Sequence, residues 1–294
     1  MNEGERDTKK KKIAFVLSGG GSLGSVQVGM IKALFEHGII PDFIVGTSVG
    51  AINAAFMCGN PTTEGILDLE RIWLTVRGKE IFPTGLLTSI VRILRKRNYL
   101  VSHRGLRRLL ENHLPYTTLG ETKITCLLIA TDILTGEQVV LSSGNAVNAV
   151  LASSALPGIF PAVEIAGRIL IDGAISSNTP ISVAVEYGAT EVFILPAGYA
   201  ATLQKPPSGV VDIFLHSLNI LVAQQFLHDI DIFRKAVTIH ILPPVRLENT
   251  FLSDFSKTGE YLSFSYRNTM QWLKSGGMNT FKIPGRMNPP NQWL

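Results

Sequence analysis

Short apolar runs alternate with amphipathic stretches along almost the whole 294-residue chain. Runs such as IAFVLS and ITCLLIAT are apolar at successive positions, which is typical of strands that are covered on both faces of a mainly parallel sheet. The pattern predicts strands at 13–18, 43–47, 124–131, 138–142, 168–172, 191–196 and 236–242.

Between these strands, apolar residues recur at helical spacing. In the stretch 63–77, Ile66, Leu69, Trp73 and Val76 fall three or four positions apart and so share one helical face. Helices are predicted near 24–37, 50–58, 63–77, 102–113, 145–154, 180–187, 210–228 and 260–275. The alternation of strands and helices, without an internal repeat, predicts a single α/β domain.

The composition fits a folded chain, because 46% of the residues are hydrophobic and 17% are charged. We expect residues 1–12 to form a disordered basic tail and residues 13–244 to form the domain. Within the domain, 78–120 is predicted to be a less regular basic insertion, and 245–294 a C-terminal extension packed on the outside.

The cellular compartment is predicted from what the chain lacks and from its two cysteines. The first apolar run, IAFVL, is too short for the core of a signal peptide, and no run of 18 apolar residues follows. Cys58 and Cys126 lie in apolar surroundings, as core thiols in a reducing compartment do. A cytoplasmic protein is therefore expected, with peripheral membrane contact as an option.

The first strand ends in a glycine-rich turn, LSGGGSLG. Gly19, Gly21 and Gly24 match the G-x-G-x-x-G pattern of dinucleotide sites, but that fold also places an acidic residue at the end of the second strand. Here Asp42 precedes that strand. The alternative is that the closely spaced amides of Gly19, Gly20 and Gly21 form an oxyanion hole.

The second predicted strand ends in GTSVG, residues 46–50. One interpretation is ordinary turn chemistry. The other is a strand-to-helix elbow that holds Ser48 as a nucleophile, with Gly46 and Gly50 where side chains would collide. Ser22 also fits G-x-S-x-G, but Ser48 is favoured because it lies between a strand and a helix.

A nucleophilic serine needs a base. None of the six histidines follows a strand in a short glycine-bearing loop. Asp172 does end a predicted strand and is followed by Gly173, so its carboxylate is a candidate base, although Asp-Gly is also a common turn. No Cys, His or carboxylate cluster has ligand spacing, and neither a metal nor a cofactor is expected.

Together these motifs resemble the patatin-like phospholipase family. Members carry a glycine-rich oxyanion loop, a G-x-S-x-G elbow and a D-G-A or D-G-G aspartate, which match Gly19–Gly24, Gly46–Gly50 and Asp172–Ala174 in that order. SSALPGIFP (153–161) and DGAISSNTP (172–180) add to the likeness.

The resemblance implies a three-layer α/β/α fold and a dyad of Ser48 and Asp172 without histidine. It also implies hydrolysis of fatty-acyl esters of lipids or phospholipids through an acyl-enzyme. One position departs from the family, because Leu23 stands where the glycine loop usually has arginine or lysine.

Two other functions stay open at this point. One is a lipid-binding or regulatory protein with weak catalysis, and the other, less favoured, is a dinucleotide-binding oxidoreductase. Nothing resembles a nucleic-acid recognition helix, so no nucleic-acid partner is expected. The oligomeric state does not follow from the sequence.

The net charge of +4 is uneven, because residues 92–108 carry seven arginines and lysines among leucines. This stretch is either a solvated helix face or a face that lies on anionic lipid. If it lies on lipid, reversing Arg95, Lys96 and Arg97 to Glu will weaken binding to anionic vesicles in a flotation assay. Added salt will weaken the wild-type binding, and unchanged binding by the variant would support the solvated face.

Overall fold

The computed structural model describes residues 11–82, 99–198, 209–245, 255–281 and 283. Arg92, Arg95, Lys96 and Arg97 of the basic stretch lie outside these residues, as does most of the predicted tail. The strands are β1 (Ile13–Leu17), β2 (Phe43–Thr47), β3 (Thr125–Asp132), β4 (Gln138–Leu141), β5 (Val163–Ile165), β6 (Arg168–Asp172), β7 (Glu191–Leu195) and β8 (Thr238–Ile241).

Most helices lie close to the residue ranges predicted from the sequence. They are α1 (Gly24–Glu36), α2 (Val49–Gly59), α3 (Thr63–Thr75), α4 (Gly78–Ile81), α6 (Arg104–His113), α7 (Ala146–Ser153), α8 (Ala174–Ser177), α9 (Ile181–Glu186), α10 (Val210–Phe233) and α11 (Thr258–Lys274), with 3-10 helices η1 (Gly21–Leu23), η2 (Leu119–Glu121) and η3 (Gly277–Asn279).

Short elements and one helix end differ from the prediction. β5, α4 and α8 have three or four residues each, too few to show a hydrophobic period. The helix predicted to end at 228 continues to Phe233, although Asp229 and Asp231 interrupt its apolar pattern. The remaining predicted strands and helices are confirmed within a few residues.

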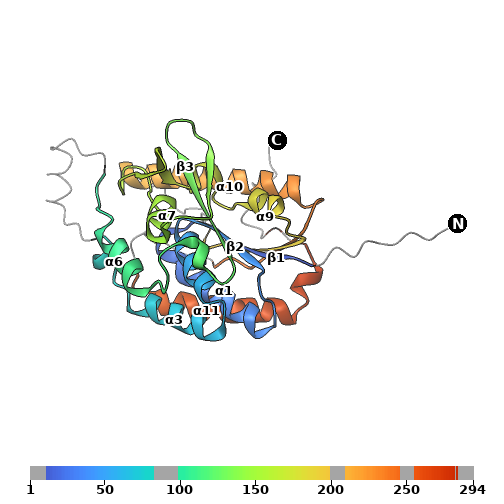
Figure 1. Ribbon diagram of the computed structural model, residues 1–294. Coiled ribbons are helices and arrows are strands. Elements are labelled where there is room, and N and C mark those ends of the chain that lie inside the picture. The colour runs from blue at the N-terminus through green and yellow to red at the C-terminus, as the bar shows by residue number, and fades with distance from the viewer. Residues whose placement is uncertain (1–10, 83–98, 199–208, 246–254, 282, 284–294) are drawn as a thin grey trace.

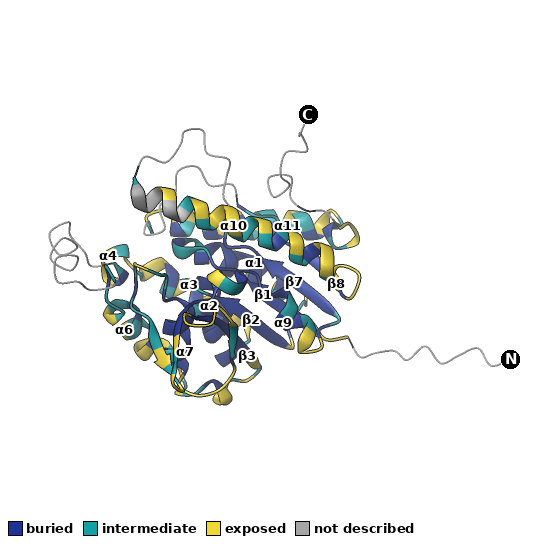
Figure 2. Ribbon diagram, turned by 90° about the horizontal axis from the view of Figure 1, so that it is seen from above, coloured by how far each residue is buried: buried dark blue, intermediate teal, exposed yellow. Residues whose placement is uncertain are grey.

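Two layers of helices cover the sheet, as Figure 1 shows. One apolar cluster joins one face of the sheet to helices α1, α2, α3, α6, α7 and α11. A second cluster joins the opposite face to α9 and α10. The strands are therefore largely buried between helices whose outer faces are exposed (Figure 2), and the predicted three-layer α/β/α fold is confirmed.

The sheet is mixed. Hydrogen-bonded pairs follow the order β5–β6–β3–β2–β1–β7–β8, and β4 also pairs with β3. β2, β1, β7 and β8 run parallel to β3, whereas β4 and β6 run antiparallel to it. The parallel part carries the βα turns that the glycine motifs predicted.

The pairing of β2 and β6 with β3 brings the C-terminal ends of these two strands together. β2 pairs with β3 as far as Thr47 opposite Ile129, and β6 pairs with β3 from Leu170 to Asp172, which lies opposite Ala130. β4 pairs with residues 128–131 of β3, so it occupies the other side of β3 from both. The C-terminal ends of β2 and β6 therefore meet at adjacent positions on one side of β3.

Helix α11 packs directly on α1. Gly29 lies in the middle of α1, and a Cβ at this position would collide with the carbonyl of Leu262 and the hydroxyl of Ser265. Leu262 and Ser265 are buried on α11. The glycine allows the two helix backbones to approach closely, which fixes α11 against the helix that follows the glycine-rich turn.

Gly29→Ala should therefore lower the free energy of unfolding by about 1–3 kcal/mol, as overpacked sites do. This loss would arise despite the roughly 1 kcal/mol that alanine gains over glycine in helix propensity. Urea denaturation measures it. Gly120→Ala is the matched control, because a Cβ there meets no atom within 4 Å. Equal stability of the two variants would contradict the close α1–α11 contact.

Candidate active site

Ser48 occupies a strained turn between β2 and α2. Its backbone has φ 55° and ψ −120°, a conformation that L-amino acids rarely adopt and that costs about 1–3 kcal/mol. A Cβ on Gly46 would collide with the Gly50 carbonyl, and a Cβ on Gly50 with the Leu17 carbonyl. The two flanking glycines therefore permit the sharp elbow, as the sequence predicted for this motif.

The elbow brings Ser48 to Asp172. The Ser48 hydroxyl donates to Asp172 Oδ2 at 2.8 Å, and the backbone N–H of Ala174 donates to Asp172 Oδ1 at 2.9 Å. Asp172 is 1% exposed, whereas Ser48 is half-buried. A Cβ on Gly173 would collide with the Ile129 carbonyl, so glycine at this position lets the chain leave β6 tightly against β3.

Burial raises the pKa of Asp172 from an ordinary 3.8 to about 7, and the hydrogen bonds from Ala174 and Ser48 lower it only in part. Asp132 on β3 and Arg168 on β6, the strand that Asp172 ends, pair with each other at 2.6 Å. Among the described residues, no cation contributes to the pKa of Asp172, which is set by burial and by the hydrogen bonds from Ala174 and Ser48. Its pKa lies where a general base at neutral pH is effective.

The glycine-rich turn passes beside Ser48. A Cβ on Gly19 would lie 3.2 Å from Ser48 Cβ and would collide with the side-chain oxygen of Asn178. A Cβ on Gly20 would lie 2.6 Å from Ala197 Cβ, and Gly21 has φ 60°. Each of the three positions therefore requires glycine for space or for conformation.

The three amides differ in their hydrogen bonding. The Gly19 N–H donates to the Asn178 carbonyl at 3.3 Å, so it is already occupied. No hydrogen bond to a backbone carbonyl is recorded for the N–H groups of Gly20 and Gly21 within the described residues. They are the two amides of this turn that are available to an anionic oxygen.

A buried polar network, which the sequence analysis missed, fixes both ends of this turn. The Gln27 side chain donates to the carbonyls of Ser18 at 2.8 Å and Leu195 at 3.0 Å. Asn53 donates to Gln27 Oε1 at 2.8 Å and to the Gly24 carbonyl at 2.9 Å.

The network ends in α3, where Trp73 Nε1 donates to Asn53 Oδ1 at 2.8 Å. A Cβ on Gly24 would collide with the Trp73 ring, so this motif glycine makes room for it. The signal in the sequence was a single amide side chain within each of two apolar helices, α1 and α2.

The other residues considered from the sequence have these surroundings. Ser22 is buried in η1, and the half-buried Leu23 packs on the core. His103 stacks on Phe160, and burial together with Arg107 lowers its pKa to about 4. His240 on β8 lies 2.7 Å from the carboxylate of Glu191 on β7 and hydrogen-bonds to it. No histidine hydrogen bond to Ser48 or Asp172 occurs in the described part of the chain.

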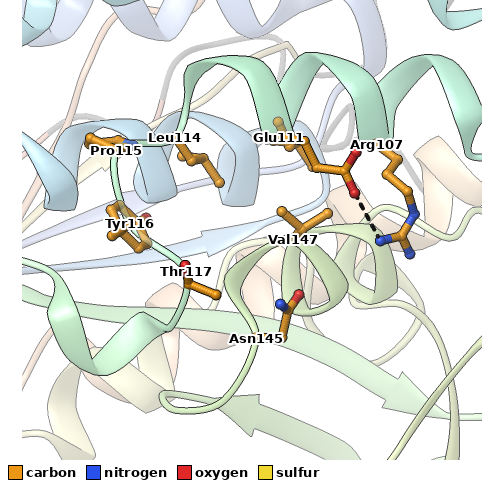
Figure 3. A pocket seen from close by; sticks show the side chains of 9 residues that line it. Arg107, Glu111, Leu114, Pro115, Tyr116, Thr117, Asn145 and Val147 are labelled. Atoms are coloured by element: carbon orange, nitrogen blue, oxygen red, sulfur yellow. Dashed lines mark hydrogen bonds and ion pairs between the residues drawn. The ribbon is translucent and has the colours of Figure 1, made fainter.

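A cavity of about 400 Å³ opens between α6 and α7, in the layer of helices that contains α1 and α2 (Figure 3). Its walls come from α6, from the 114–117 segment and from the start of α7 at Asn145 and Val147. Neither Ser48 nor Asp172 lines it. Among the described residues, no helix is long and apolar enough to cross a membrane, and no cluster of three His, Cys, Asp or Glu could hold a metal.

Curated proteins similar to this chain include patatin-like phospholipase domain-containing protein 7 of Rattus norvegicus, 30% identical over 192 residues that make up 63% of this chain and 14% of the relative. Lysophospholipase NTE1 of Cryptococcus neoformans is 29% identical over 209 residues, 67% of this chain and 12% of the relative. An uncharacterised NTE family protein of Mycobacterium bovis is 29% identical over 176 residues, 59% of this chain and 28% of the relative. The chain thus spans less than a third of the length of these relatives.

Among solved structures, VipD from Legionella pneumophila matches 90% of this chain and 67% of its own with 15% identity and a TM-score of 0.47. Human GIVD cytosolic phospholipase A2 matches 85% of this chain and 46% of its own with 13% identity and a TM-score of 0.45. The model of the patatin-like phospholipase family matches residues 15–185, which is more than half of the chain and includes Ser48 and Asp172. The chain therefore belongs to the patatin-like phospholipase family.

Proposed function

We propose that this chain is a serine acyl hydrolase that cleaves fatty-acyl esters of lipids with Ser48 as nucleophile and Asp172 as base. The observation that carries the proposal is the 2.8 Å hydrogen bond from the Ser48 hydroxyl to Asp172 Oδ2. A carboxylate at this distance can take the hydroxyl proton directly, without an intervening imidazole.

The first half of the reaction forms an acyl-enzyme. Ser48 Oγ attacks the carbonyl carbon of the ester while its proton passes to Asp172 Oδ2. The tetrahedral intermediate collapses when the bond to the leaving oxygen breaks, and protonated Asp172 gives its proton to this leaving alkoxide, which departs as the alcohol. Asp172 is then ionised again and Ser48 carries the acyl group as an ester.

The second half releases the acid. Asp172 accepts a proton from a water molecule, whose oxygen attacks the acyl carbon. When this second tetrahedral intermediate collapses, the Ser48 oxygen leaves and recovers the proton from Asp172. The raised pKa of Asp172 serves both halves, because the group must alternate between base and acid near neutral pH.

The negative oxygen of each tetrahedral intermediate needs donors that are in place beforehand. We assign this role to the N–H groups of Gly20 and Gly21, whose turn runs beside Ser48. Gly19 contributes by its lack of a side chain, since its own N–H is bound to Asn178. Rigid donors of this kind are worth about 2.7–4 kcal/mol each in transition-state stabilisation.

The substrate class rests on family membership. One relative is named a lysophospholipase, so lysophospholipids and phospholipids are the first lipids to test. The two alternative functions have less support. A regulatory protein without catalysis does not require a buried carboxylate hydrogen-bonded to a strained serine. A dinucleotide site would place an acidic residue at the end of the second strand, but β2 ends in Thr47, which is followed by Ser48.

A fluorophosphonate probe, which reacts with activated serines, tests the dyad together with hydrolysis of a short p-nitrophenyl ester. Ser48→Ala should abolish labelling and hydrolysis. Asp172→Asn should lower the rate by roughly 100- to 10,000-fold, since it removes the base at nearly constant shape. Ser22→Ala is the matched control, because Ser22 belongs to the competing G-x-S-x-G, and it should keep a substantial rate.

Each of the six histidines changed to Gln should cost roughly tenfold or less, far below the loss of a general base. The rate should also fall below a pH of about 7, because the base must be ionised. A histidine variant as inactive as Ser48→Ala, with Asp172→Asn still active, would overturn the assignment of the base.

The same pKa predicts a pH effect on stability. The folded pKa of Asp172 is about 7 and the ordinary value is 3.8, so the folded state holds the proton more tightly. The free energy of unfolding therefore falls as pH rises from about 4 to about 7. Relative to the wild type, Asp172→Asn should gain about 2–3 kcal/mol of stability between pH 5 and pH 8 in urea denaturation. A stability difference that is the same at both pH values would contradict a buried, uncompensated carboxyl.

A further inference from the structure

Three consecutive residues at the end of α7 contact both members of the proposed dyad. On the serine side, Ser153 Oγ accepts the backbone N–H of Ser48 at 3.0 Å. The Ser154 hydroxyl donates to the carbonyl of Ser48 at 3.2 Å. The N–H and the C=O of the strained residue are thus both held by neighbouring serine side chains.

The same segment binds the aspartate side through its backbone. The Ala155 carbonyl accepts the N–H of Asp172 at 3.0 Å, and the Ser153 carbonyl accepts the N–H of Gly173 at 3.3 Å. One short segment therefore sets the position of Ser48 relative to Asp172, although these two residues are 124 positions apart in the chain.

The recorded hydrogen bond of the Ser153 side chain is not made within its own helix. A serine within a helix commonly bonds the carbonyl one turn earlier on its own helix. Here the recorded hydrogen bond of the Ser153 hydroxyl reaches instead to a residue 105 positions away. Ser153 is also 0% exposed, so water cannot replace the hydroxyl as acceptor for the Ser48 N–H.

This acceptor matters because of the conformation that it holds. At φ 55°, Ser48 is in an unfavourable region of backbone conformation, and it relaxes unless its surroundings fix it. A small rotation of this backbone moves Oγ away from Asp172 and from the amides of Gly20 and Gly21. A displacement of the nucleophile by about 1 Å can cost roughly 100-fold in rate.

We infer that Ser153 is a positioning residue, whose buried hydroxyl holds the Ser48 backbone so that Oγ points at Asp172. The inference rests on the proposed function, since it explains how Ser48 is held in position relative to Asp172. Ser154 supports the same residue from its carbonyl side. Ser153 itself does not touch the reacting atoms.

The test compares Ser153→Ala with wild type in fluorophosphonate labelling and in p-nitrophenyl ester hydrolysis. The alanine variant should label and turn over roughly 10- to 100-fold more slowly with an unchanged KM, because the nucleophile and not the binding surface is displaced. Ser154→Ala should show a smaller loss, since its hydroxyl makes the longer of the two contacts.

A pH profile separates positioning from general loss of structure. The hydrogen bond from Ser48 lowers the pKa of Asp172, so a displaced Ser48 moves the acid limb of the Ser153→Ala profile to higher pH. Apart from Ser48, the recorded donor to the Asp172 carboxyl is the Ala174 N–H, which does not titrate. The Thr131 hydroxyl donates to the backbone carbonyl of Asp172 and not to its carboxyl. The nearby charges, Asp132 and Arg168, remain paired.

Two variants serve as controls. Ser265→Ala removes a hydroxyl that is likewise 0% exposed, from α11, and should change stability without changing the rate constants. Ser153→Thr keeps the oxygen and should restore most of the rate even if its extra methyl lowers the melting temperature. If the alanine variant does not fold, Ser153→Cys has a similar volume with only a weak acceptor, and should be as slow.

Fluorophosphonate labelling of the wild type is measured first. If the wild type is not labelled, the proposed hydrolase function is refuted, and this result is distinct from a failure of the positioning role. Given a reactive wild type, three results would each overturn the inference. These are a Ser153→Ala or Ser153→Cys rate within twofold of wild type, an equal rate loss in Ser265→Ala, and a Ser153→Thr variant as slow as the alanine variant.

Discussion

The pairing of two strands on one side of β3 determines the geometry of the candidate site. β2 arrives parallel to β3 and ends opposite Ile129, and β6 arrives antiparallel and ends opposite Ala130. Two chain ends at adjacent positions of one strand cannot separate without breaking the sheet. The elbow at Ser48 and the tight exit at Gly173 then turn both chains away from the same point. A mainly parallel fold thereby uses its antiparallel part to deliver the carboxylate.

The chemistry proposed at this point depends on removing water rather than on placing an opposite charge. Asp172 is 1% exposed and has only hydrogen-bond donors around its carboxyl among the described residues. An ion pair would have lowered its pKa and made it a poor acid for the leaving group. Burial raises the pKa of Asp172, and this lowers the stability of the folded state as the pH rises from about 4 to about 7. The rigid neighbours of Ser48 and of the glycine turn are what allow such an unfavourable group to be kept in place.

Most of the fold and the outline of the site followed from the sequence, because apolar periods and glycine turns are local signals. The strands that end before Ser48 and at Asp172 and the helix after Ser48 were predicted within a few residues, whereas the short helix α8 after Gly173 was not predicted. The register of β6 on β3 could not be predicted, since it depends on contacts between distant segments. For the same reason, Asp172 alone was indistinguishable from an Asp-Gly turn. Gln27 and Asn53 gave only a weak signal, because a lone amide in an apolar helix does not show what it binds.

The close packing of α1 on α11 has a consequence for synthesis of the protein. Helix α1 follows the first strand and carries the glycine turn, whereas α11 comes after every strand in the described part of the chain. A chain that emerges from the ribosome in order can therefore assemble its sheet while the face of α1 around Gly29 still lacks its cover. Apolar surface that waits for a late helix is prone to association with other chains. We expect nascent molecules at this stage to bind chaperones, because this face of α1 is covered only once α11 has been made.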